Sequence, residues 1–374
     1  MFVASHLPGK GQNADANRWF IRSMSRGKIL SVAGALLLAL LAEGPGHWAE
    51  VQAAVARISF VIATGPTGGT YFPIGEAIAG IVSHPPGVFR CEQATLCGPP
   101  GLIASVRTSQ GAAANVLAVN AHTVEAALAQ SDVVAEAAAG RGIFRRVGAQ
   151  THIRVLAGLY PEEVHLVALK SAHVRSLTDL RRKRVSVGPE MSGTMVTVRT
   201  ILAAIHLPLS QMKADHADSD SAAEKLAKAQ IDALFFVGGS PVPLVRELLQ
   251  GGRAVLVPIA GKPRENLLKK APTLTAATIP AGVYPNTGKV ETVGVRAVLI
   301  ANDSLPDSVA YGVVRALFSP VNRSMLAGSH RSAQAISIDA AAINPPAPLH
   351  PGAAQFYKEI GKLPKAPPAK SGKP

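Results

Sequence analysis

RISFVIATGPTGGTYFPIGEAIAGIVS, residues 57–83, joins a short apolar run to a helical pattern through a turn rich in glycine and threonine. The apolar, β-branched run predicts a buried strand that ends at Gly65. The segment PIGEAIAGIVS then places apolar residues at helical spacing, and Pro73 is tolerated in a first helical turn. Glycine lets a backbone approach a ligand closely, and free N–H groups at a helix start favour a carboxylate or phosphate. The turn therefore predicts either an anion site or an ordinary tight turn.

The turn does not match the common nucleotide-binding motifs. No lysine follows the glycines, which excludes a Walker loop. Gly65, Gly68 and Gly69 also lack the spacing of a dinucleotide fingerprint. The donors that remain are backbone N–H groups and the hydroxyls of Thr64, Thr67 and Thr70.

Polar helix starts of the same kind recur further along the chain. Their residues are Gly111 and Asn115, then Ser192, Gly193 and Thr194, and then Gly238, Gly239 and Pro241. Ser192 is a good cap for the helix that follows it. Several donor-rich helix starts in one chain favour the binding of a small anion more strongly than one of them does.

Predicted strands and helices alternate along the chain, which is typical of an α/β fold with largely parallel sheets. Glycine turns gather before about residue 140 and after about residue 185, which predicts two such sheets. Ligands of open α/β sheets lie beyond the carboxyl ends of the strands, so two facing sheets would share one ligand. Residues 154–169, RVLAGLYPEEVHLVAL, predict two short strands around a turn at Pro161.

The chain of 374 residues carries a formal charge of +14, which suits a nucleic-acid binder or a receptor for small anions. A nucleic-acid binder is expected to place aromatic residues among its basic ones. The basic run at residues 181–184, RRKR, has no aromatic residue beside it. We therefore interpret it as a solvated segment and expect no nucleic-acid partner.

The N-terminus predicts export to the periplasm. Basic residues precede the apolar run ILSVAGALLLALLA, residues 29–42, which has the length of a signal-peptide core. A membrane span would need about 20 apolar residues. We therefore predict a signal peptide at residues 1–56, with an uncleaved anchor as the alternative. The Pro- and Lys-rich residues 363–374 are expected to be a disordered tail.

The two cysteines are Cys91 and Cys97. Their spacing, without a matching cluster of histidines or cysteines, is poor for zinc. In an oxidising compartment we expect a structural disulfide between them that closes a tight loop. A redox-active pair is the alternative, although the C-x-x-C motif is missing.

The sequence contains few signs of a catalytic site. There is no G-x-S-x-G or H-E-x-x-H, and the histidines are scattered. His165 lies in an apolar strand pattern, which favours a core residue over a base. Asp132, in AQSD, is interpreted as a hydrogen-bond acceptor rather than a general base. We expect a binding protein and not an enzyme, with no catalytic residue, no metal and no cofactor.

Several segments, in order, resemble the TAXI subfamily of solute receptors from tripartite ATP-independent periplasmic (TRAP) transporters. ATGPTGGTYFPIGEAIAGI resembles the family opening, a strand followed by G-T-G-x-x-G-x-Y-Y/F-P-x-G. The resemblance spans roughly residues 57–362 and continues through AQSD, LYPEEVHLVA, SLTDLRRKRVSVG, SGT, IDALFFVGGSP, IPAGVYP and LHPGAAQFYKEIG. It departs at Ala112, where the family usually has a serine whose hydroxyl often faces the ligand.

The resemblance implies an α/β, two-lobed periplasmic binding protein of type II, with the ligand cleft between the lobes. Lobe 1 would comprise residues 57–169 and 290–362, and lobe 2 residues 170–289. The ligand would be a small organic anion, typically glutamate, glutamine, 2-oxoglutarate or a related dicarboxylate. Carried over by position, the ligand-binding residues would be Thr64, Gly65, Gly69, Tyr71, Asn115, Ser131 and Asp132 in lobe 1, and Ser192, Gly193, Thr194, Pro241 and Tyr284 in lobe 2.

The partner implied is a TRAP-type membrane permease, to which a monomeric receptor delivers its ligand. One alternative is a receptor of the same fold for an ATP-driven importer. A second is a sensor that presents its closed form to a membrane kinase. An exported enzyme is the third alternative, which the lack of a nucleophile–base pair disfavours.

Overall fold

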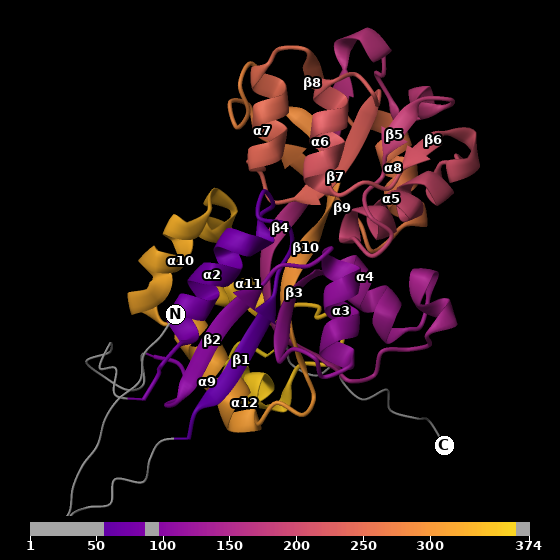
Figure 1. The fold of residues 1–374 in the computed structure, drawn as a ribbon. Helices are drawn as coiled ribbons and strands as arrows, with labels where there is room; N and C mark the ends of the chain where they lie inside the picture. The colour runs from indigo at the N-terminus through magenta and orange to yellow at the C-terminus, as the bar shows by residue number, and fades with distance from the viewer. Residues whose placement is uncertain (1–55, 87–96, 364–374) are drawn as a thin grey trace, which may run out of the picture. The chain divides into compact units, whose positions relative to one another are not determined.

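Strands and helices alternate along residues 56–86 and 97–363, which the computed structural model describes (Figure 1). All of these residues belong to the unit Val55–Pro374. Three predictions lie wholly or partly outside the described residues: the signal peptide up to residue 55, Cys91 as the partner of Cys97, and the tail from residue 364. In the two described ranges, no helix is long and apolar enough to span a membrane.

The first part of the chain has the predicted strand, glycine turn and helix. Its elements are β1 (Ile58–Ala63), α2 (Tyr71–Val82), β2 (Leu102–Arg107), α3 (Ala112–Asn120), β3 (Ala126–Gln130), α4 (Ser131–Ala138) and β4 (Ile153–Leu169). β3 is buried along its whole length, as its apolar sequence predicts. Its last residue, Gln130, is followed at once by α4.

The second part repeats this alternation. Its elements are β5 (Arg184–Ser186), α5 (Gly193–Ala204), β6 (Lys213–Asp215), α6 (Ser219–Ala227), β7 (Ala233–Gly238), α7 (Pro243–Gln250), β8 (Ala254–Leu256), α8 (Gly261–Lys270), β9 (Thr275–Ile279) and β10 (Val290–Asn302). Side chains cap two of the helices: Ser192 accepts a hydrogen bond from the N–H of Met195 in α5, and Asp218 accepts one from the N–H of Ser221 in α6. The prediction that Ser192 caps a helix is thus confirmed.

A single ten-stranded sheet contains the strands of the described residues in the order β2-β1-β3-β10-β4-β7-β5-β6, with β8 beside β4 and β9 beside β10. β1 runs parallel to β2 and β3, and β5 runs parallel to β6 and β7. β10 is antiparallel to β3 and β4, and β4 is antiparallel to β7. The parallel strands therefore form two groups, which the antiparallel pair β4–β10 joins (Figure 1).

Two clusters of buried apolar residues pack against this sheet. The first core draws on residues 60–160 and 297–357, and includes Val196. The second core draws on residues 164–295. β4 and β10 contribute to both cores, and each passes from one core to the other in mid-strand. The predicted two-part α/β fold is confirmed, whereas the lobe limits at 169/170 and 289/290 stay a prediction.

Two details of the predicted sheets are wrong. The strands form one continuous sheet rather than two, because β4 and β10 are long enough to pair in both groups. Residues 153–169 are one strand rather than two short ones around a turn. Pro161 is accommodated where the β4–β10 pairing shifts register, between Arg296 and Val298. An irregular point of this kind tolerates a residue that has no N–H to donate.

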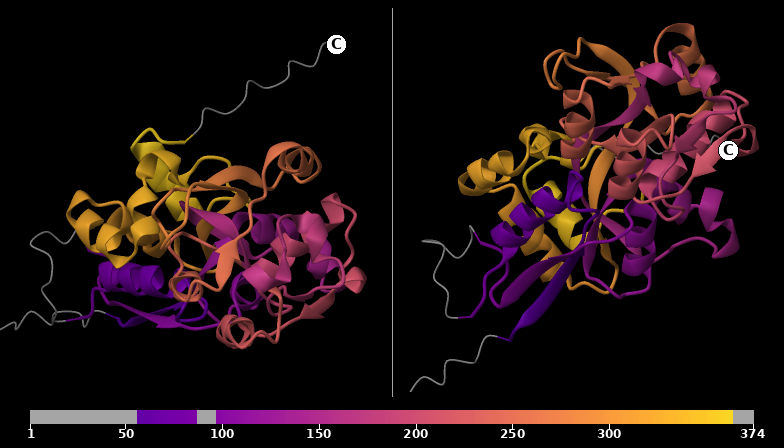
Figure 2. Two further views of the ribbon diagram at one scale, coloured as in Figure 1. Left: turned by 90° about the horizontal axis from the view of Figure 1, so that it is seen from above. Right: turned by 45° about the horizontal axis from the view of Figure 1, so that its top comes forward.

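The C-terminal helices return to the first core. They are α9 (Asp307–Leu317), α10 (Arg323–Ser329), α11 (Ile338–Ala341) and α12 (Pro351–Glu359). α9 packs against α12 and α2, and α10 also contacts α2 (Figure 2). Buried Tyr357 donates its hydroxyl to the carbonyl of Leu156 in β4, 2.9 Å away. His350 caps α12, because its side chain accepts a hydrogen bond from the N–H of Gly352.

This topology predicts different behaviour for two fragments. Residues 57–170 lack the part of β10 that lies between β3 and β4, so we expect no cooperative thermal unfolding by circular dichroism. Residues 162–296 contain the whole second core in one continuous segment, so they are expected to fold alone. A cooperative transition for residues 57–170 would contradict this account of the fold.

Candidate functional site: a cavity between the two cores

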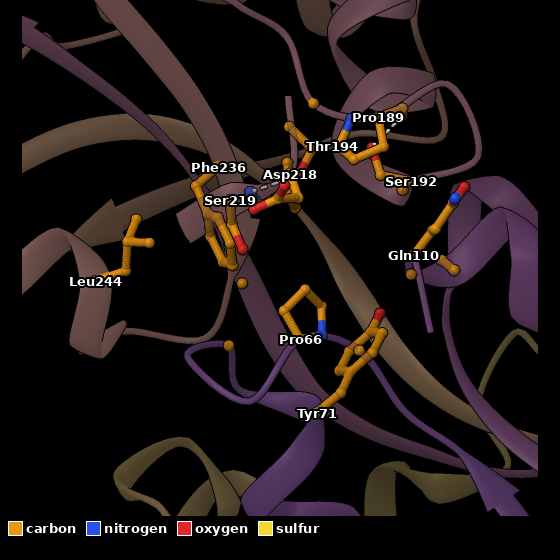
Figure 3. Close-up of a pocket in the computed structure, with 18 of the residues that line it drawn as sticks. Pro66, Tyr71, Gln110, Pro189, Ser192, Thr194, Asp218, Ser219, Phe236 and Leu244 are labelled. Atoms are coloured by element: carbon orange, nitrogen blue, oxygen red, sulfur yellow. Dashed lines mark hydrogen bonds between the residues drawn. The ribbon is translucent and has the colours of Figure 1, made fainter. Parts of the chain in front are cut away.

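A cavity of about 400 Å³ lies between residues of both cores. Tyr71 and Pro66 border it on one side, and Thr194, Asp218 and Phe236 lie across from them (Figure 3). Its size suits a small organic molecule.

Several helices begin at this cavity. α2 presents Thr70 and Tyr71, α3 presents Gly111 and Ala112, α5 presents Gly193 and Thr194, and α6 presents Asp218 and Ser219, all of which line the cavity. The first N–H groups of a helix have no partner within the helix, and the helix dipole is positive there. Converging helix starts therefore provide donors for an anionic or strongly polar ligand.

The charged side chains that line the cavity are acidic. Among the described residues they are Glu162, Asp218 and Asp220, and no lysine, arginine or histidine accompanies them. The carboxylate of Asp218 caps the start of α6, where it accepts hydrogen bonds from the N–H and the hydroxyl of Ser221. The overall excess of positive charge therefore does not extend to the described lining of the cavity.

Glu162 is the buried acid of this lining, with 1% of its surface exposed. The hydroxyl of Tyr71 donates to its Oε2 atom over 3.0 Å. Burial raises the pKa of Glu162 well above its ordinary value, and the neighbouring Asp132 and Glu163 act in the same direction. The neutral carboxyl is thus favoured, because an ionised one would be buried without a cation.

Gln130 is one of the lining residues that the sequence analysis missed, as are Glu162, Asp218 and Phe236. Gln130 is 2% exposed, and neither Nε2 nor Oε1 has a hydrogen-bond partner among the described residues. Its position explains the omission, because Gln130 is the last residue of a fully buried apolar strand. Its position in the sequence could have indicated a role in binding, because Gln130 is a polar residue at the carboxyl end of a strand, where ligands of α/β sheets bind.

The structure brings part of the predicted site together at the cavity. These residues are Gly65, Thr67, Gly69, Tyr71, Ser192, Gly193 and Thr194. They come from the turn before α2 and from the start of α5, which lie far apart in sequence. That they contact a ligand stays a prediction.

The other predicted residues lie outside this lining and are engaged with the protein itself. Thr64 donates its hydroxyl to the carbonyl of Arg107, and the Asn115 amide donates to the carbonyls of Thr64 and Leu128. Tyr284 donates its hydroxyl to His165, within a buried pair, and accepts from the N–H of Val242. The remaining residues are Ser131, which accepts from the N–H of Arg296, Asp132, which accepts from Thr197, and Pro241, whose carbonyl oxygen lies 3.0 Å from Nε2 of His330.

Three hydrogen bonds connect the chain across the cavity region. Thr70 donates its hydroxyl to the carbonyl of Gly239 over 3.2 Å. The N–H of Ala114 in α3 donates to the carbonyl of Met191, just before α5, over 3.0 Å. The hydroxyl of Thr197 in α5 donates to Asp132 in α4 over 2.7 Å. The described structure therefore has the two sides of the cavity in contact.

A group of possible metal ligands lies elsewhere, outside the cavity lining. His122, His152 and Asp303 are exposed, and their donor atoms lie within 4.8 Å of one another. His152 is 3.0 Å from Asp303, and Arg154 is 3.5 Å from the same carboxylate. Because Arg154 already supplies a cation to Asp303, we assign no metal to this group.

Asp132 predicts a measurable dependence of stability on pH. Burial raises its folded-state pKa to about 6 from an ordinary value of 3.8, although hydrogen bonds from Thr197 and Val133 oppose the rise. The folded protein therefore holds this proton more tightly, and the contribution of Asp132 to stability falls as pH rises from about 4 to about 6. The shift corresponds to about 3 kcal/mol.

In Asp132→Asn this fall is absent, so the variant should gain about 3 kcal/mol relative to wild type between pH 4 and pH 7 in denaturant unfolding. Asp179→Asn is the matched control, because hydrogen bonds from Arg175 and Ser176 lower the pKa of exposed Asp179. Its difference from wild type should have the opposite sign and develop mainly below pH 4, so it should change little between pH 4 and pH 7. Parallel curves for Asp132→Asn and wild type would show that Asp132 does not titrate in this way.

Solved structures with a related chain trace include binding proteins from several bacteria. MatC from Rhodopseudomonas palustris with bound malate is 14% identical, with a TM-score of 0.49 over 81% of this chain and 97% of that one. The alkanesulfonate-binding protein SsuA from Xanthomonas axonopodis pv. citri, bound to MOPS, is 15% identical, with a TM-score of 0.45 over 83% and 96%. PhnD1 from Prochlorococcus marinus (MIT 9301), in complex with methylphosphonate, is 10% identical, with a TM-score of 0.49 over 82% and 99%. At these identities and TM-scores the likenesses do not indicate a ligand for this chain.

A family model matches residues 62–361, which include the second core, all of the first core except Phe60, and the helix starts at the cavity. This match extends over well more than half of the 374 residues. The protein therefore belongs to the NMT1-like family.

Proposed function

We propose that the protein is an exported solute receptor that captures a small organic anion in the cavity and delivers it to a membrane permease. The observation that carries the proposal is the convergence of helix starts from both cores on one cavity of about 400 Å³. A carboxylate held there would take hydrogen bonds from N–H groups that have no partner in their own helices.

The two cores correspond, in this proposal, to two lobes that close on the ligand. The chain passes between them within β4, between residues 160 and 164, and within β10, between residues 295 and 297. A pair of hydrogen-bonded strands with few other connections is a natural hinge. The proposed hinge therefore lies several residues inside the lobe limits that the family resemblance implies.

The composition of the lining favours binding over catalysis. No histidine, cysteine or lysine lines the cavity among the described residues, so the hydroxyls of Ser192 and Ser219 lack a base that would activate them. Glu162 is the strongest candidate for acid–base chemistry, but its carboxyl is paired with Tyr71. Turnover of a bound organic acid by the purified protein would favour the enzyme alternative.

The resemblance to TAXI receptors supports a TRAP-type permease as the partner, and the signal-peptide pattern supports a periplasmic location for a monomeric receptor. An ATP-driven importer and a membrane-bound sensor kinase are equally compatible with the cavity. The genes beside this one distinguish the alternatives. A neighbouring gene for a multi-span permease would support a TRAP transporter as the partner, and a neighbouring gene for an ATPase would contradict it.

The start of α5 gives a direct test of the proposed site. A Cβ atom placed on Gly193 would lie 1.4 Å from Oε1 of Gln130 and 3.0 Å from the Cβ of Ala112, so a side chain would displace the Gln130 amide or push α5 away from the first core. We expect Gly193→Ala to weaken the binding of the best organic acid by about tenfold or more, which is at least about 1.4 kcal/mol. Isothermal titration calorimetry on the mature protein, after a thermal-shift screen of organic acids, measures this effect.

Gly328→Ala is the matched control, because Gly328 is also in a helix and its Cβ would meet nothing within 4 Å. It should bind like wild type. Equal affinity of Gly193→Ala and wild type would show that the ligand site lies elsewhere. Failure of every organic acid in the screen to bind would contradict the proposed function itself.

A further inference from the structure

The buried side chain of Gln130 has hydrogen-bonding capacity that the described protein does not use. A primary amide offers two donors on nitrogen and an acceptor oxygen. Both Nε2 and Oε1 of Gln130 are buried and without a partner among the described residues, and the residue lines the cavity. Buried polar groups are nearly always paired, so an unpaired amide at a binding cavity points to a group of the ligand.

The amide lies between the two sides of the cavity. Gln130 belongs to β3 of the first core, and its Oε1 atom packs against the position of Gly193 at the start of α5. The absence of a side chain at Gly193 is what leaves room for this approach. A ligand group paired with Gln130 would therefore sit beside the N–H groups that begin α5.

The charges that line the cavity limit the chemical nature of the ligand group that pairs with Gln130. The described lining contains no lysine, arginine or histidine, and the buried carboxyl of Glu162 is favoured in its neutral form. One carboxylate of a ligand has the helix starts as donors, but a second would be buried without a cation. Burying an unpaired charge is costly. A neutral carboxamide has the same shape as a carboxylate, and it can both donate a hydrogen bond to Oε1 of Gln130 and accept one from Nε2.

Resting on the proposed function, we infer that Gln130 determines the specificity of the site. Its amide pairs with a neutral group of the ligand that both donates and accepts hydrogen bonds, such as a carboxamide. The preferred ligand carries one carboxylate and such a group, and dicarboxylates are discriminated against.

The test compares ligands that differ only in one carboxamide and one carboxylate. Calorimetry on the mature protein uses glutamine against glutamate, and succinamate against succinate. Wild type is expected to bind the amide member of at least one pair about tenfold or more tightly, because a mismatched buried hydrogen bond costs about this much. Gln130→Met keeps the volume and removes both polar ends, so it should lose this preference.

Gln150→Met is the matched control. Gln150 is also buried, at 6% exposure, but its Nε2 atom donates to the carbonyl of Gly148. Without ligand, Gln130→Met should unfold at a temperature equal to or above that of wild type, because no protein hydrogen bond is lost. Gln150→Met should unfold at a lower temperature and keep the ligand preference of wild type.

Four results would overturn the inference. The first two are a wild-type preference for the dicarboxylate member of both pairs and an unchanged preference in Gln130→Met. The others are a fall in the unfolding temperature of Gln130→Met like that of Gln150→Met, and failure of wild type to bind either amide. The proposed function then stands or falls on the wider screen of organic acids.

Discussion

The antiparallel pairing of β4 with β10 is the constraint on which the rest of the structure depends. Both strands are long, at 17 and 13 residues, and each is buried first in one core and then in the other. One of the two shifts in their register lies between Arg296 and Val298, next to the point where the chain changes core. Every other strand of the described sheet joins one group or the other, so the geometry of this pair sets how the two sides of the cavity meet.

The cavity achieves its polarity through the backbone rather than through basic side chains. Helix starts from both cores provide N–H donors, while the described charged lining is acidic. Backbone donors are fixed by the fold and require no reorganisation when a ligand binds, which favours specific binding. The buried, unpaired amide of Gln130 is the lining group that, by our inference, distinguishes a carboxamide from a carboxylate.

The α/β class and the strand–turn–helix at residues 57–83 could be predicted from the sequence, because apolar periodicity and glycine turns are local signals. The continuous sheet could not be predicted, because a proline such as Pro161 locally favours a turn. It is its pairing with Arg296, beside a register shift, that accommodates Pro161 within a strand. Lining residues such as Gly193 were predictable from the start of a helix. The contacts of Asn115 and Tyr284 were not, because the polar atoms that pair with them, in Thr64 and His165, lie 51 and 119 residues away in the sequence. Gln130 was hidden by the apolar strand that contains it.

The central claim is that one small ligand is held by both cores at once. Amide hydrogen exchange of the mature protein, with and without the best-binding organic acid, tests it most directly. The account predicts that exchange slows together at the start of α2, around Tyr71, and at the start of α5, around Gly193 and Thr194. Protection confined to one core, or to a surface away from the cavity, would contradict it.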